Sequence, residues 1–234
     1  MNNEEVNLTN DAYSLHRILK TDIKKDPNVE EDEIIFGCGC FWGAEKCFWK
    51  LPGVVTTSVG YAGGEKNNPT YYEVCSGLTG HSEVVRVIWD KREIDVSDLL
   101  KMFWECHDPT QKNRQGNDMG TQYRSAIYYK NENNIKTILA SKEQYQTELS
   151  KKNLGLIETE IKMIDSYFYA EQYHQQYLAS AGSRQYCSAS PTKVKLGVFT
   201  GSNYKLEDHI WENFNWEVDK CVLRSDNKPI KYDI

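Results

Sequence analysis

The residue best placed for nucleophilic chemistry is Cys40, in the sequence GCFWG at residues 39–43. A short β-type run ends just before it and a helical pattern begins just after it, so we expect Cys40 at a helix N-terminus. Unpaired backbone N–H groups and the helix dipole lower the pKa of a cysteine at that position and favour a nucleophilic thiolate. A buried structural cysteine fits the position about equally well.

Glu83 is the candidate proton donor. It ends the sequence GHSE at residues 80–83 and begins a strand rich in Val and Ile at 84–88. Burial would raise the pKa of this carboxyl group and make it a general acid near neutral pH. A solvent-facing glutamate is the commoner arrangement at the start of a strand, because Glu is rarely buried. Burial therefore decides between the two roles.

Two tyrosines follow turn-forming sequences and could present a phenol to a cleft. Tyr71 follows NPT at residues 68–70, and Tyr123 follows GTQ at residues 120–122. A phenol can donate a hydrogen bond to a substrate oxygen. The chain has 15 tyrosines, however, so packing is the more frequent role for any one of them.

Several thiols and one imidazole invite a zinc interpretation, namely Cys38, Cys40, Cys47, Cys75, Cys106 and His107. Zinc ligands mostly occur in pairs separated by roughly two to four residues. Here the close pairs are CGC at 38–40 and the adjacent residues 106–107, which match that pattern poorly. We expect no metal centre.

Strand and helix patterns alternate around these residues. Strands are predicted at residues 34–36, 54–59, 83–89, 123–129 and 157–163, and helices at 41–51, 96–104 and 132–150. Ser97 is expected to cap the second helix. The order has no repeat and predicts an α/β (α+β) fold: a two-layer sandwich with a mixed β-sheet and a ferredoxin-like core. An irregular C-terminal tail is expected to wrap on that core.

Composition narrows the class of protein. The chain has 234 residues, with 28 Lys plus Arg against 34 Asp plus Glu and a formal net charge of −6, which argues against a nucleic-acid binder. The uncharged apolar stretch at residues 34–44 is too short to cross a membrane. No export signal opens the sequence, so we expect a cytoplasmic protein whose seven cysteines are reduced. We divide the chain into a polar, loosely docked N-terminal arm (1–31), one domain (32–187) and a C-terminal extension (188–234).

Ordered motifs between about residues 36 and 187 carry a family resemblance. They are GCFWG (39–43), GYAGG (60–64), NPTY (68–71), VCSG (74–77), TGHSE (79–83), HDPT (107–110), RQGND (114–118), GTQYR (120–124) and HQQYL (174–178). Together they resemble peptide-methionine sulfoxide reductase A, the family that reduces the S epimer of methionine sulfoxide. The resemblance implies a catalytic domain at 32–187 that repairs oxidised proteins and peptides, with free methionine sulfoxide as a further candidate substrate. It also implies a monomer without a cofactor.

The resemblance assigns roles to the residues chosen above. Cys40 is implied as the nucleophile, Glu83 as acid and base, and Tyr71 and Tyr123 as donors to the sulfoxide oxygen. Negative charge develops on that oxygen during attack at sulfur, which is why neutral proton donors are needed there.

Four further residues are implied to contact the substrate: Gly39, Phe41, Trp42 and Asp118. The two aromatic rings would form an apolar wall that holds the S-methyl group and selects the epimer. A zinc-binding structural module and a protein that only binds oxidised methionine are the competing classes. A metal assay tests the first, and thiol-dependent turnover tests the second.

Recycling is implied to need a second cysteine. Methionine leaves Cys40 as a sulfenic acid, and in the family a second thiol converts it to a disulfide that thioredoxin reduces. Cys187 occupies the corresponding place, although SASP at 188–191 follows it where family members often have glycines. Cys221 is a second relay candidate in the tail. We predict that a Cys40–Cys187 disulfide forms first, with transfer to Cys221 as an option before thioredoxin acts.

Overall fold

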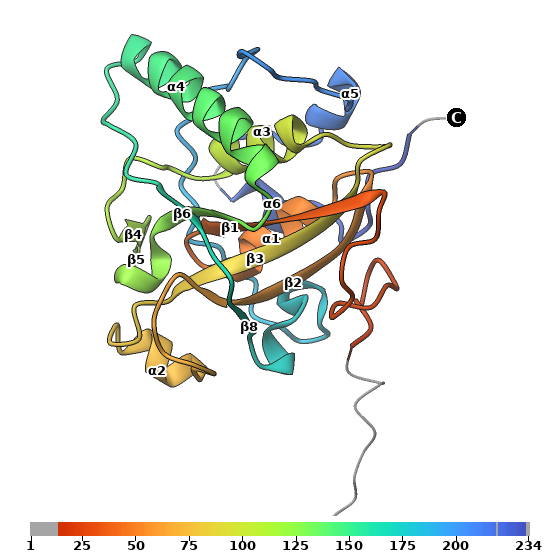
Figure 1. Ribbon diagram of the computed structural model, residues 1–234, viewed down its shortest axis with the longest axis vertical. Coiled ribbons are helices and arrows are strands. Elements are labelled where there is room, and N and C mark those ends of the chain that lie inside the picture. The colour runs from red at the N-terminus through yellow and green to blue at the C-terminus, as the bar shows by residue number, and fades with distance from the viewer. Residues whose placement is uncertain (1–13, 219, 233–234) are drawn as a thin grey trace, which may run out of the picture.

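The computed structural model describes residues 14–218 and 220–232. In this part of the chain the main sheet has six strands in the spatial order β7-β6-β1-β3-β2-β8 (Figure 1). They are β1 (Glu31–Cys38), β2 (Val54–Ala62), β3 (Ser82–Asp90), β6 (Ser125–Tyr129), β7 (Glu160–Met163) and β8 (Tyr167–Tyr169). Neighbours are antiparallel except for β6 and β7, which are parallel, so the sheet is mixed as predicted.

The helices form the second layer. Helices α1 (Phe41–Trp49) and α3 (Val96–Cys106) pack on the sheet, and α4 (Ile135–Lys151) packs on α3 (Figure 1). The succession β1, α1, β2, β3, α3, β6 gives the strand order β6-β1-β3-β2. This is the βαββαβ arrangement of a ferredoxin-like core. The predicted two-layer α+β fold is confirmed.

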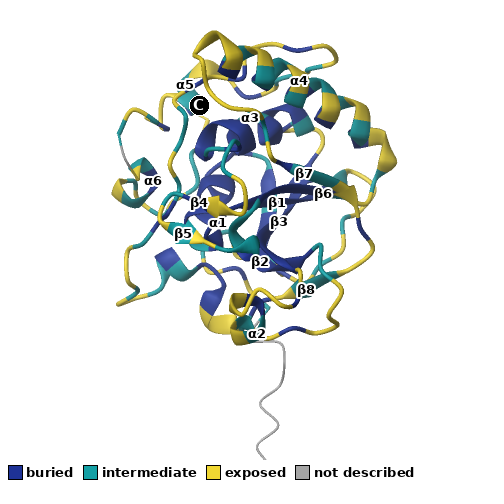
Figure 2. Cartoon of the chain, turned by 90° about the vertical axis from the view of Figure 1, so that its left-hand side faces the viewer, coloured by how far each residue is buried: buried dark blue, intermediate teal, exposed yellow. Residues whose placement is uncertain are grey.

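Alternation along the central strands decides which side chains face the helices. In β1, Ile34 and Phe36 join the main core, whereas Ile35 joins a smaller cluster of buried residues. In β3, Val85 belongs to the main core, so Glu83, two residues earlier, faces the helices as well. Figure 2 shows how thoroughly the central strands and α1 are buried. The sheet thus aims a carboxyl group into the layer that contains Cys40.

Helix α3 is not capped by the expected residue. Asp95 is the N-cap: its carboxylate accepts a hydrogen bond from the Ser97 N–H at 2.9 Å, and the Asp98 carboxylate accepts one from the Asp95 N–H at 3.1 Å. Ser97 lies inside the first turn, and its hydroxyl donates to Asp95 at 2.7 Å. The prediction of a Ser97 cap was wrong because a carboxylate satisfies the same free N–H groups and also suits the positive end of the helix dipole.

Short elements fill the connections. They are α2 (Tyr71–Cys75), the hairpin strands β4 (Arg114–Gln115) and β5 (Asp118–Met119), and the 3₁₀ turns η2 (Thr121–Tyr123), η3 (Glu132–Asn134), η4 (Gln172–His174) and η5 (Tyr177–Ala179). The hairpin and the turns η2, η4 and η5 supply much of the candidate site described below.

The C-terminal extension follows an irregular path over the helical layer, with only the short helices α5 (Asp208–Trp211) and α6 (Cys221–Arg224) in its described part. Two side chains of α1 hold the tail in place. Lys46 donates to the Ser225 carbonyl at 2.7 Å, and Trp49 Nε1 donates to the Asn227 carbonyl at 3.2 Å. The predicted irregular tail on the core is confirmed.

The expected N-terminal arm, residues 1–31, runs into β1, and residues 1–13 of it lie outside the described residues. In residues 14–30, Ile23 is buried, and so is His16, which hydrogen-bonds Thr57 at 2.9 Å. This part is docked more firmly than a loose arm, because its buried side chains belong to the core. None of the helices in the described ranges is long and apolar enough to span a membrane.

Candidate active site

Cys40 lies at the N-cap of α1, directly after the turn that leaves β1, as the sequence predicts. Gly39 makes that turn with φ of +85°, and an added Cβ would come within 2.5 Å of the Gln115 side chain. Only glycine fits both requirements without strain. The Cys40 side chain is buried, and the backbone N–H of Trp42 points at its sulfur.

The electrostatic setting of Cys40 differs from the prediction. Burial, and after it the neighbouring Glu83, raise the pKa of the Cys40 thiol well above its usual value. The hydrogen bond from the Trp42 N–H acts in the opposite direction and is outweighed. The prediction of a thiolate in the resting enzyme was therefore wrong. Burial removes water from the anion, and this loss destabilises the thiolate more than the helix N-terminus stabilises it.

Glu83 is buried, so the solvent-facing arrangement left open by its sequence position does not apply. Burial raises the pKa of its carboxyl group to about 8, a nearby Asp118 adds to the rise, and the Phe41 N–H, donating to Oε2 at 3.2 Å, opposes it. The group therefore holds its proton at neutral pH. A neutral carboxylic acid and a neutral thiol lie together at the first turn of α1.

Tyr71 and Tyr123 come from α2 and η2 and converge on the same space. Burial raises the pKa of both phenols, so both remain hydrogen-bond donors at physiological pH. Glu171 holds the start of α2, since its carboxylate accepts from the Tyr71 N–H and from the Tyr61 hydroxyl, each at 2.8 Å. A residue far along the chain thus positions the first phenol.

These side chains surround one open cavity of about 460 Å³. Its lining comprises Cys40, Phe41, Trp42, Tyr71, Glu83, Asp118, Tyr123, Tyr177, Arg184 and Tyr186. Seven of these ten residues are candidates chosen from the sequence. Gly39, expected at the substrate, is not among the lining residues; it forms the turn that aims Cys40 into the cavity.

The aromatic wall has a support that the sequence reading missed. Trp42 stacks on Tyr177, with ring centroids 3.8 Å apart and an interplanar angle of 14°. Trp42 Nε1 also donates to His174 Nδ1 at 3.1 Å. Phe41 is buried beside the His174 ring. His174 and Tyr177 belong to the quoted motif HQQYL, which was the available signal for them.

Asp118 is held in place by a further residue that was not identified from the sequence. The Tyr186 hydroxyl donates to Asp118 Oδ1 at 2.6 Å. Asp118 ends the quoted motif RQGND, whereas nothing in the sequence pattern singled out Tyr186. This bond connects the β5 strand to the segment that carries Cys187.

The two candidate recycling thiols lie outside this cavity, in a second one against α1. Cys187 is buried, and a Cβ added to Gly43 would lie 2.4 Å from its sulfur. The next residue, Ser188, accepts a hydrogen bond from the Cys40 N–H at 3.4 Å, so Cys187 lies close to the nucleophile in space. Cys221, at the start of α6, lines the same second cavity and is half-buried.

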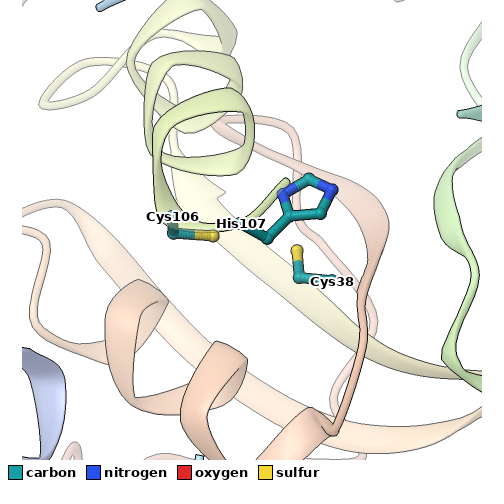
Figure 3. A group of neighbouring side chains, drawn as sticks. All are labelled: Cys38, Cys106 and His107. Carbon is teal, nitrogen blue, oxygen red and sulfur yellow. The ribbon is translucent and has the colours of Figure 1, made fainter. Parts of the chain in front are cut away.

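Cys38, Cys106 and His107 form a buried group whose sulfur and nitrogen atoms lie within 4.8 Å of one another (Figure 3). The His107 ring has no free lone pair: Nδ1 donates to the Phe103 carbonyl at 2.7 Å, which leaves Nε2 to accept from the Ser125 hydroxyl at 2.8 Å. Two thiols remain in the group, fewer than the four ligands of a structural zinc site. The hydrogen bonding therefore does not suit a metal.

Comparison with known proteins shows the family to which the chain belongs. A family model described as peptide methionine sulfoxide reductase matches residues 32–204. The peptide methionine sulfoxide reductase MsrA of Vibrio vulnificus is 53% identical over 180 residues, covering 77% of this chain and 86% of that protein. The protein of the same name from Azotobacter vinelandii is 57% identical over 164 residues, covering 70% and 76%.

Solved structures give the same result. Methionine sulfoxide reductase A of Corynebacterium diphtheriae superposes with a TM-score of 0.67 at 42% identity, covering 78% of this chain and 88% of that one. Reduced Mxr1 of Saccharomyces cerevisiae gives a TM-score of 0.64 at 34% identity, covering 70% and 92%. The chain therefore belongs to the peptide methionine sulfoxide reductase family, in its A class, and is an enzyme that reduces methionine sulfoxide.

Proposed function

We propose that the enzyme reduces the S epimer of methionine sulfoxide by attack of Cys40 on the sulfoxide sulfur, with Glu83 as the proton donor to the oxygen. One observation carries the proposal: Cys40, Glu83, Tyr71 and Tyr123 line a single cavity. Glu83 supplies the proton because its pKa is raised to about 8 by burial. The Cys40 thiol gives up its proton as it attacks, which requires the oxygen to gain one in the same step.

The cavity offers a separate place for each group on the substrate sulfur. The oxygen lies toward the phenols and Glu83, where donors stabilise its developing charge. The methyl group lies against Phe41 and Trp42, whose orientation is held by the stack on Tyr177. The remaining chain leaves through the open side of the cavity. Since sulfoxide sulfur is chiral, fixing three of its substituents relative to Cys40 accepts one epimer and rejects the other.

Product chemistry leads to the recycling thiols. Methionine departs, and the oxygen remains on Cys40 as a sulfenic acid. Cys187 then attacks this sulfur, water leaves and a Cys40–Cys187 disulfide forms; Cys221 exchanges with it, and thioredoxin reduces the result. Two observations support this order: Cys187 lies beside Gly43, and the Ser188 hydroxyl accepts a hydrogen bond from the Cys40 N–H. We propose that this cycle takes place in the cytoplasm, where thiols stay reduced. We also propose that the enzyme is a monomer.

An epimer-resolved assay tests the function. Purified enzyme with dithiothreitol is given the separated S and R epimers of a dabsylated methionine sulfoxide, and methionine is measured over time. We expect turnover of the S epimer and only background for R, because the R epimer exchanges the places of methyl group and oxygen. Equal turnover of the two epimers would rule out the three-point arrangement. No thiol-dependent turnover of either would remove the proposed function.

Recycling distinguishes Cys187 from Cys221. We expect Cys187→Ser to release one equivalent of methionine and then stall with thioredoxin, because the buried thiol beside Gly43 is the one near Cys40. Cys221→Ser should still form a Cys40–Cys187 disulfide, which peptide mapping after one turnover detects. The assignment is reversed if Cys187→Ser recycles at the normal rate while Cys221→Ser stalls.

A further inference from the structure

Five of the seven cysteines line one cavity next to the active site. They are Cys38, Cys47, Cys106, Cys187 and Cys221. The cavity has an accessible volume of about 10 Å³, room for roughly one water molecule, so the sulfurs surround a nearly filled space. The recycling chemistry proposed above uses Cys187 and Cys221 and leaves three thiols without a role.

Cys47 lines this sulfur cavity and interacts with three of its other thiols. It lies on α1 and is within hydrogen-bonding reach of the Cys106 thiol at the end of α3, a helix in contact with α1. It is also close enough to interact electrostatically with Cys187 and with Cys221. Cys38 also lies close to Cys106, as Figure 3 shows for that pair. The thiols thus form a series from Cys221 and Cys187 through Cys47 to Cys106.

We propose that Cys47 and Cys106 are an internal dithiol that reduces the Cys187–Cys221 disulfide when no external reductant reaches the enzyme. The inference rests on the proposed function, which supplies that disulfide. It adds a second redox site behind the catalytic one, built on two helices rather than on the tail.

The exchange balances within the protein. The Cys47 thiolate attacks the sulfur of Cys187, the bond between the Cys187 and Cys221 sulfurs breaks, and Cys221 leaves as a thiolate. The Cys106 thiolate then attacks the Cys47 sulfur and releases Cys187. Two electrons pass to Cys187 and Cys221, and the protons lost by Cys47 and Cys106 end on the two released thiolates. No outside oxidant or reductant takes part.

Two features of the cavity suit this exchange. Cys47 lies next to the ammonium group of Lys46, and Lys220 lines the cavity near Cys187; both charges favour the thiolates that form during the exchange. The hydrogen bond to the Cys106 thiol, and after it burial, act against them and raise the pKa of Cys47, so the exchange should be slow at neutral pH and faster as pH rises. Thioredoxin, when present, would therefore reach the disulfide first.

The stoichiometry of methionine release tests the proposal. We call the Cys47 and Cys106 dithiol the reserve. Without the reserve, the enzyme stores one oxidising equivalent as the Cys187–Cys221 disulfide and one as sulfenic acid on Cys40, so it releases about two methionines. With the reserve it releases about three. The experiment mixes reduced full-length enzyme with an excess of N-acetyl-methionine S-sulfoxide, without reductant, and counts methionine at several pH values. Peptide mapping then identifies the disulfides.

We expect about three equivalents from the wild type and about two from Cys47→Ala and Cys106→Ala, with a slow third phase that speeds up with pH. Cys38→Ala is the matched control, because Cys38 is equally buried in the same cavity; it should keep the third equivalent. Release of the first equivalent reports on the fold of each variant, and Cys47→Val replaces Cys47→Ala if that release is lost. A wild type that stops at about two, or a third equivalent that survives in the Cys47 variant, overturns the inference. No first equivalent in the wild type would instead refute the proposed function.

Discussion

Cys40→Ser is expected to reduce methionine formation to the level of a reaction without enzyme. A serine hydroxyl cannot form a sulfenic acid, and its oxygen is far less nucleophilic than a thiolate. The fold should survive, since serine is close in size to cysteine and is a favoured N-cap residue for α1. The measurement is turnover of the S epimer with dithiothreitol, next to thermal unfolding of the same sample.

Cys38→Ala serves as the control for Cys40→Ser, because Cys38 is a buried thiol two residues away that points into the core. It should retain most of the activity. A folded Cys40→Ser enzyme with substantial turnover would mean that another thiol is the nucleophile.

Glu83→Gln is expected to slow the step that releases methionine by about 10²-fold or more, since the amide keeps the shape but has no proton to give. In the wild type the same step should slow as pH rises through about 8, where the raised pKa of Glu83 lets the carboxyl group ionise. The variant should lack this decrease. Single-turnover rates from pH 6 to pH 10 measure both effects, and a rate close to wild type in the variant would assign proton transfer to the phenols or to water.

The same carboxyl group has an effect on stability that checks its burial independently. In the unfolded chain Glu83 ionises near pH 4.5, whereas in the folded enzyme it keeps its proton up to about pH 8. Between these values the unfolded state binds fewer protons, so the free energy of unfolding falls as pH rises, by at most about 1.4 kcal/mol per pH unit. Glu83→Gln removes this contribution. Denaturant unfolding of both proteins across that range should show the difference growing with pH.

The sequence predicted those parts of the enzyme that depend on local pattern. Runs of β-type residues predicted β1 and β3, and the change from strand to helix placed Cys40 at an N-cap. The raised pKa of Cys40 could not be predicted in the same way, because it depends on burial by the segment around Ser188, nearly 150 residues away. The local effect of the helix end was identified correctly and is the weaker one.

The residues missed at the site come from segments without periodicity. Tyr177, His174 and Tyr186 lie in turns and irregular chain between β8 and the tail, where neither helical nor strand spacing marks a side chain as facing the cavity. The sulfur cavity was missed for a related reason: its thiols come from β1, α1, α3, the end of the domain at Cys187 and the tail, which are brought together only by tertiary packing. Spacing along the chain, the basis of the zinc interpretation, carries no information about such a cluster.

Trapping the sulfenic acid tests the central claim most directly. The double variant Cys187→Ser/Cys221→Ser lacks both proposed recycling thiols, and dimedone reacts with sulfenic acids as they form. After reaction with one equivalent of the S epimer, mass spectrometry of peptides should find the dimedone adduct on Cys40, in an amount equal to the methionine released. Methionine released without an adduct on Cys40, or with the adduct on another cysteine, would contradict the account.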